Sequence, residues 1–283
     1  MPNIKNEKLA IPIVVFAGLL WSLGPIVVRN MDNPAMVIWQ YLFARGIVIF
    51  CLLNFYLFFE EGFEFYKNYL KIGISGIVGG IGLGTAMMTF IWSITHTTVA
   101  ITLLCLAAMP FITALLGFLF LKEKLSINVW IAISVASTGI VIMAFGSASL
   151  ESIDGLIFGL ASAVGFSIFS VTLRWRKETP KFTTVAIAGL FTCLFSLVII
   201  IQNDLNFFDS SKNGGLSALH GTLVCLGLIL YSVGSKVIPA AELTLLSLTE
   251  VIGGIFWVWI PIFGINEIPA NNTIIGGFLI FMA

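Results

Sequence analysis

Long apolar runs alternate with short polar separators along the whole chain. An α-helix rises 1.5 Å per residue, so about 20 apolar residues cross about 30 Å of hydrocarbon. The final run, Thr273–Ala283, rises only about 16 Å, so we expect it either to cross half a bilayer or to continue beyond Ala283. The runs predict ten membrane-spanning helices: Ala10–Val28, Met36–Phe58, Leu70–Trp92, Val99–Leu121, Val129–Phe145, Gly155–Leu173, Phe182–Ile201, Leu216–Ser235, Ala240–Ile262 and Thr273–Ala283.

The composition supports this pattern. Of the 283 residues, 59% are hydrophobic and only 10% are charged, whereas a soluble domain carries about 25% charged residues. So few charges cannot cover a soluble globule, which excludes a soluble enzyme, a nucleic-acid binder and a disordered chain. The sequence therefore predicts an all-α polytopic membrane protein whose principal partner is the lipid bilayer.

The cysteines give no sign of a metal site. All four lie inside apolar runs, and none forms a C-x-x-C pair or stands beside a histidine. Such cysteines behave as small core residues. We therefore expect no metal and no cofactor.

Lysine and arginine are distributed unevenly between the two sides of the predicted membrane. Two of the fourteen, Arg29 and Lys212, fall outside if the N-terminus is cytoplasmic, and Arg45 falls inside a span. Cytoplasmic loops carry an excess of these residues, so the pattern predicts a multi-pass protein of the cytoplasmic membrane with its N-terminus in the cytoplasm. The eleven cations on the cytoplasmic side are Lys5, Lys8, Lys67, Lys71, Lys122, Lys124, Arg174, Arg176, Lys177, Lys181 and Lys236.

The two halves resemble each other at an offset near 141 to 145 residues. We divide the chain into residues 1–146 and 147–283, with five spans each; five is odd, so the second repeat enters the membrane inverted. Inverted repeats are typical of alternating-access carriers, whose binding site lies near the midplane. The matching segments are Trp21-Ser22 and Arg29 with Phe166-Ser167 and Arg174, Val99–Leu104 with Ala240–Leu245, and the sequence around Glu123 with that around Glu267.

Three motifs carry a family resemblance. They are M-P-F-I-T-A-L-L-G-F-L-F-L-K-E-K-L-S at 109–126, G-L-L-W-S at 18–22 and L-L-S-L-T-E-V at 245–251. Together they resemble the EamA-like branch of the drug/metabolite transporter superfamily. The resemblance implies two five-helix repeats and secondary transport of small metabolites in either direction. The chain departs from the family where Val251 replaces a common proline and where three residues are inserted before Glu267.

Ionisable groups inside the membrane are candidates for function. Arg45 and Glu250 lie near the centres of the second and ninth spans, and Glu242 lies near the cytoplasmic end of the ninth. Arg45 keeps its charge, so it either forms a bidentate fork for a substrate carboxylate or phosphate or pairs permanently with Glu250. In a third arrangement, Glu250 holds Arg45 until substrate displaces it.

Glu250 has a polar and small-residue face around it. Ser247, three residues before it, and Gly254 and Trp257, four and seven residues after it, share its face of the helix. Burial disfavours the charged form of a carboxyl group, which makes Glu250 a candidate to carry a coupling proton. The alternative is a permanently protonated side chain bonded to a neighbouring helix. The predicted substrate-binding residues are Arg45, Trp21, Ser22, Glu250, Ser247, Trp257 and Tyr41.

Small residues and proline predict how the spans pack and bend. Gly76, Gly80 and Gly84 follow each other at intervals of four, which lets helix backbones approach closely. Pro110 and the pair Gly253-Gly254 lie at near-equivalent places in the two repeats, so we predict hinges there.

The sequence as a whole predicts a secondary active transporter, not an enzyme, that moves a small polar or anionic metabolite by alternating access. Amino acids and organic acids are the favoured substrates, and protons are the candidate coupling ion. The alternatives are an exporter of another metabolite or drug-like compound and, with less support, a membrane-embedded enzyme, because H-E-x-x-H and G-x-S-x-G are absent from the sequence. Substrate identity, direction, coupling ion and oligomeric state stay open.

Overall fold

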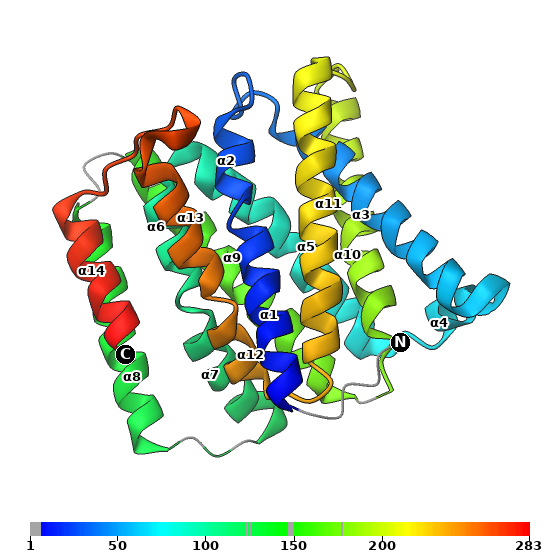
Figure 1. Cartoon of the computed structure of the whole chain (residues 1–283), viewed down its shortest axis with the longest axis horizontal. Coiled ribbons are helices and arrows are strands. Elements are labelled where there is room, and N and C mark those ends of the chain that lie inside the picture. The colour runs from blue at the N-terminus through cyan, green and yellow to red at the C-terminus, as the bar shows by residue number, and fades with distance from the viewer. Residues whose placement is uncertain (1–6, 123, 125, 147–149, 177) are drawn as a thin grey trace.

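The computed structural model describes residues 7–122, 124, 126–146, 150–176 and 178–283, and Lys5, Glu123 and Lys177 lie outside these ranges. Every regular element in the described ranges is a helix (Figure 1). The first half contains α1 (Glu7–Trp21), α2 (Gly24–Arg29), α3 (Ile38–Glu61), η1 (Gly62–Tyr66), α4 (Lys67–Leu70), α5 (Gly73–His96), α6 (Val99–Leu106), α7 (Met109–Leu121) and α8 (Ile127–Gly146). The second half contains α9 (Leu150–Trp175), α10 (Lys181–Gln202), α11 (Ser211–Gly234), α12 (Ala240–Leu246), α13 (Thr249–Trp259), η2 (Pro261–Phe263) and α14 (Asn271–Met282).

The predicted all-α membrane architecture is confirmed. Within the described ranges, nine stretches are long and apolar enough to cross a bilayer. The tenth predicted span corresponds to α14, whose 12 residues rise only about 18 Å. Figure 1 shows α14 beside α8, ending above the lower end of α8.

Two spans are interrupted near their centres at a proline. The first stops at Trp21 and resumes with Gly24 and Pro25 in α2; the fourth stops at Leu106 and resumes in α7, with Pro110 in its first turn. Proline has no backbone N–H to donate to the residue four positions earlier, so it favours a new helix start. The predicted bend at Pro110 therefore coincides with a real break.

A third break divides the ninth span at Ser247 and Leu248, where no proline is present. The N–H of Glu250 bonds the carbonyl of Ser247 at 2.9 Å, and that of Val251 bonds Leu248 at 2.9 Å. These bonds span three residues, so the helix tightens there into a 3₁₀ turn. The Ser247 hydroxyl bonds the carbonyl of Thr244 at 2.7 Å, a local bond that competes with the helical ladder.

The two glycines of the predicted hinge, Gly253 and Gly254, lie inside α13 in this structure. They are instead points of close packing. A Cβ atom on Gly253 would lie 2.7 Å from the Cβ of Ser22, and one on Gly254 would lie 2.5 Å from a methyl group of Leu103. These residues let α13 approach α2 and α6, while the bend lies earlier in the span.

The contacts between the two halves are symmetric: when a helix of one half packs on a helix of the other, the equivalent helices form the same pair. α5 packs on α9, and α11 packs on α1, which is the equivalent pair when the halves are swapped. α3 packs on its own counterpart α10, and α8 packs on α14. Pairings of this kind are those that two halves related by a two-fold axis make.

Gly76, Gly80 and Gly84 face α10. A Cβ atom on Gly80 would lie 3.0 Å from the carbonyl oxygen of Thr184, and one on Gly84 would lie 3.1 Å from that of Ala188. The absence of side chains therefore brings the backbones of α5 and α10 together, as small residues do in membrane bundles.

The two ends of the bundle differ in charge. We call the end where α1 begins and α9 finishes the basic face, and the opposite end the Arg29 face. Large apolar side chains such as Leu194 and Ile252 are exposed between them, as expected for a surface in contact with lipid. The described cations of the basic face are Lys67, Lys71, Lys122, Lys124, Arg174, Arg176, Lys181 and Lys236.

This charge distribution yields a labelling prediction. If the basic face is cytoplasmic, a cysteine at the exposed Asn206, in the loop before α11, should react with a membrane-impermeant thiol reagent in intact cells. The matched control is Glu64→Cys, exposed at the basic face, which should react only after permeabilisation. The reverse pattern would invert the predicted topology.

Candidate substrate site

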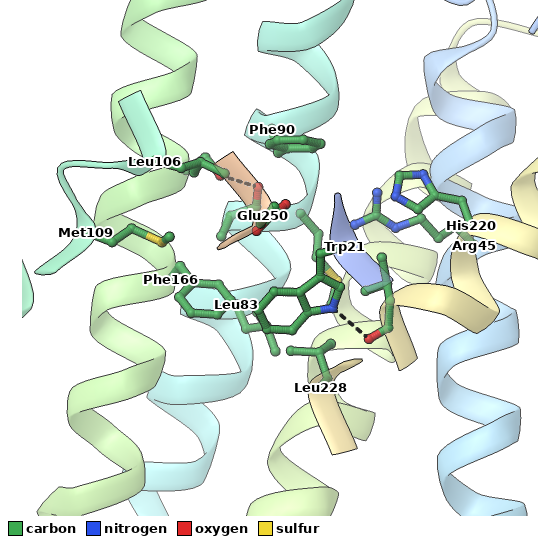
Figure 2. A pocket seen from close by; sticks show the side chains of 14 residues that line it. Trp21, Arg45, Leu83, Phe90, Leu106, Met109, Phe166, His220, Leu228 and Glu250 are labelled. Atoms are coloured by element: carbon green, nitrogen blue, oxygen red, sulfur yellow. Dashed lines mark hydrogen bonds between the residues drawn. The ribbon is translucent and has the colours of Figure 1, made fainter. Parts of the chain in front are cut away.

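A small internal cavity lies where the three broken spans meet. Its volume is about 60 Å³, which is enough for a few water molecules, so a metabolite requires its walls to move apart. Both halves of the chain contribute to the walls (Figure 2). The lining residues are Trp21, Arg45, Leu83, Ala86, Met87, Phe90, Leu106, Met109, Ser162, Phe166, His220, Val224, Leu228 and Glu250.

Trp21 forms an aromatic wall at the end of α1. It is 5% exposed, and its indole N–H donates to the carbonyl of Val224 at 3.3 Å. Its ring meets Phe166 edge-on at 5.7 Å between centroids and lies 5.6 Å from Tyr231. These contacts fix the indole, because a buried tryptophan needs a partner for its N–H.

Arg45 brings a buried positive charge to the cavity from α3. The side chain is 3% exposed, and its Nη1 donates to the hydroxyl of Tyr41 at 3.3 Å. Its Nε is buried and has no hydrogen-bond partner among the described residues. Leaving a buried donor unsatisfied is costly, so this guanidinium is prepared to bond a further group.

Glu250 brings a carboxyl group to the same cavity from the first turn of α13. Among the described residues, ion pairs join Arg29 to Glu267, Lys67 to Glu64 and Lys212 to Asp32. Arg45 and Glu250 thus line one cavity, and no ion pair joins their side chains in the described structure. The fixed-pair interpretation of Arg45 does not describe this conformation.

His220 is a further ionisable residue of the site, and the sequence analysis omitted it from the groups inside the membrane. It lies within α11, is 2% exposed, and its Nδ1 is hydrogen-bonded to the hydroxyl of Tyr41. A Cβ atom on Gly24 would lie 2.6 Å from His220 Nε2, so the break in the first span makes room for the ring. A histidine inside the apolar run Leu216–Ser235 was the signal that could have found it.

Four predicted substrate residues stand outside the cavity lining. Tyr41 lies behind Arg45 and links it to His220. Trp257 donates its indole N–H to the hydroxyl of Ser22 at 3.1 Å, and this contact ties α13 to the α1–α2 break. Ser247 caps the end of α12, whereas Glu250 lies in α13, so the break between the two helices separates them.

A second polar cluster fastens three segments at the Arg29 face. Arg29, at the end of α2, donates to Glu267 at 2.5 Å and to the carbonyls of Ile94 and Thr97 at 2.8 and 2.9 Å. The other carboxylate oxygen of Glu267 accepts the N–H of Val99 at 2.9 Å. The cluster therefore joins α2, the α5–α6 turn and the segment before α14, in a geometry that uses the guanidinium fork fully.

Glu267→Gln is expected to weaken this cluster. Hydrogen bonds to charged groups contribute about 1.5–3 kcal/mol, so labelling of a cysteine placed at Leu106, in the cavity wall, should accelerate about tenfold from the Arg29 face. The matched control is Lys212→Gln, which breaks the exposed pair with Asp32 at the same face and should change little. Equal labelling rates in both variants would show that the cluster does not restrain opening.

Comparison with known proteins agrees with this architecture. Residues 7–145 match the EamA-like transporter family. The chain is 24% identical to the uncharacterized transporter YojE of Bacillus subtilis (strain 168), over 81% of this chain and 77% of that protein. It is 27% identical to an uncharacterized transporter of Vibrio cholerae, over 81% of this chain and 74% of the relative.

A solved crystal structure has the same fold. The superposition has a TM-score of 0.65 and covers 98% of this chain and 96% of the other, at 18% sequence identity. The fold and the related transporters together define a polytopic membrane transporter. Residues 7–145 thus carry an EamA-like transporter family domain.

Proposed function

We propose that this protein is a secondary active carrier that moves a small metabolite bearing a carboxylate or comparable anion across the cytoplasmic membrane. The observation that carries the proposal is Arg45, a buried guanidinium in the cavity whose Nε has no hydrogen-bond partner among the described residues. A carboxylate supplies two parallel acceptors, which match the donor fork of arginine.

The second charge of the cavity favours an amino acid as the substrate. Glu250 lines the wall that faces Arg45 across the cavity without pairing with it (Figure 2). A zwitterion could place its carboxylate on Arg45 and its ammonium group on Glu250, so each buried charge would gain a partner. Trp21 and Phe166 offer apolar surface beside the two charges.

Alternating access is the transport mechanism that the architecture supports. The match to the EamA-like family spans residues 7–145, within the repeat assigned to 1–146, and the helix pairings exchange this half with residues 147–283. The site lies between the halves, next to breaks in three spans. Carriers with inverted repeats move one bundle against the other around such a site.

Counterflow in proteoliposomes tests the proposal. Vesicles preloaded with an amino acid or organic acid should take up the labelled compound transiently against its gradient, with a rate that saturates with concentration. Saturable counterflow is characteristic of a carrier. Single-channel currents, with uptake that rises linearly, would instead identify a channel.

A further inference from the structure

A second, larger pocket opens at the basic face and shares no residue with the central cavity. Its volume is about 520 Å³, and it lies between the end of α9, the start of α10 and the connection from α11 to α12. All of these segments belong to the second half of the chain. The described residues that line it are Leu173, Arg174, Thr179, Lys181, Phe182, Ser235, Lys236, Val237, Ile238 and Pro239.

Positive charge dominates this pocket. Arg174, Lys181 and Lys236 line it, and its described lining residues include no carboxylate. The three charges are close enough for Arg174 and Lys236 to repel that of Lys181. An anion bound among them would relieve this repulsion.

The side chains of the pocket are held in place by local contacts. Lys181 is half-buried and donates to the hydroxyl of Ser235 at 2.9 Å, and Ser235 in turn donates to the carbonyl of Ser232 at 2.8 Å. The ammonium group of Lys236 lies 5.9 Å from the centroid of the Phe182 ring. Cations and hydroxyls fixed around a cavity are the donors that phosphate oxygens require.

We propose that this basic pocket binds a phosphate group, supplied either by the headgroup of an anionic lipid or by a soluble phosphate compound. Basic pockets between membrane helices are suited to anionic headgroups, and the open volume also admits a free phosphate. A phosphate on Lys181 and Lys236 would join the start of α10 to the α11–α12 connection. The bound ion would thereby stabilise the second half of the chain at the basic face.

Thermal unfolding of the purified full-length chain tests this site without measuring transport. In detergent, inorganic phosphate should raise the melting temperature in a saturable manner, whereas chloride at equal ionic strength should not. In nanodiscs, phosphatidylglycerol should raise it above the value in phosphatidylcholine. A response to phosphate identifies a soluble ligand, and a response to phosphatidylglycerol alone identifies a lipid; no response to either would overturn the proposal.

Variants locate the response in the pocket. The double change Lys181→Gln and Lys236→Gln should weaken phosphate binding about tenfold or more, because each charged hydrogen bond contributes about 1.5–3 kcal/mol. Lys236 is exposed, so Lys236→Gln alone serves if the double variant fails to fold. Lys67→Gln, which removes a cation paired with Glu64 at the same face, should leave the response unchanged. A response that survives both pocket variants contradicts the proposal.

The central cavity provides the last control, because Arg45 is also proposed to bind an anion. Arg45→Lys should retain the full phosphate response if the basic pocket is the site. If Arg45→Lys abolishes the response while the pocket variants keep it, phosphate binds in the central cavity. The proposal for the basic pocket then fails while the proposed transport function stands.

Discussion

Arg45→Lys is expected to abolish most transport. Lysine keeps the charge but cannot supply two parallel donors to a carboxylate. Losing one charged hydrogen bond of about 1.5–3 kcal/mol should reduce kcat/KM about 10- to 100-fold. Lysine also lacks the buried Nε that has no partner in the described protein, so the variant loses the donor on which the assignment depends.

The comparison variant is Arg176→Lys, the same chemical change at an exposed site of the basic face. It should transport at the rate of the unmodified protein. Both variants should be measured by initial uptake in proteoliposomes at matched protein content, with melting temperatures to verify folding. Full activity in Arg45→Lys would make Arg45 a structural charge.

Glu250→Gln is expected to uncouple transport from a pH gradient. The glutamine imitates the protonated carboxyl, and its amide oxygen can still accept a hydrogen bond from a substrate ammonium. The site can therefore still bind and exchange substrate, but the side chain cannot release a proton. Accumulation driven by a pH gradient should therefore fall to the level observed at equal pH, while counterflow continues. Glu250 lies directly after the break between α12 and α13, where a change in its charge acts on a segment able to bend.

Two other results would reassign Glu250. Loss of counterflow as well would mean that substrate binding needs a charged carboxylate at this position, or that Glu250 supports the fold. Accumulation that still follows the gradient would mean that the coupling proton is carried elsewhere. Glu242→Gln, at an exposed position in the first turn of α12, is the matched control and should keep coupling intact.

The spans could be predicted from the sequence because each depends on a local property. Hydropathy over about 20 residues locates a membrane helix, and Pro25 and Pro110 mark breaks because proline removes a backbone donor. The break at Ser247 and Leu248 has no such mark. It depends on packing against α1, where a Cβ atom on Gly18 would lie 2.0 Å from Thr249 Oγ1 and 3.1 Å from the carbonyl of Ser247.

The sequence could predict which residues form the site, because they are energetically unfavourable in a membrane span, but not how they are arranged. Trp21, Arg45 and Glu250 were identified because buried charge and deep tryptophan are unusual in a membrane span. These residues meet in one cavity only because seven spans pack around it. The same packing places Ser247 and Trp257 outside its wall. The Arg29–Glu267 bond joins residues 238 positions apart, and no local pattern in one sequence indicates such a pair.

The proposed transport function depends on Arg45 binding the anionic group of the substrate in the cavity between the halves. Ligand-induced shifts in melting temperature test it most directly, using amino and organic acids beside their amide or ester analogues, which lack the carboxylate. The acids alone should stabilise the unmodified protein by mass action, and Arg45→Lys should lose this shift. Equal stabilisation by the analogues without a carboxylate, or an undiminished shift in Arg45→Lys, would contradict the role of Arg45.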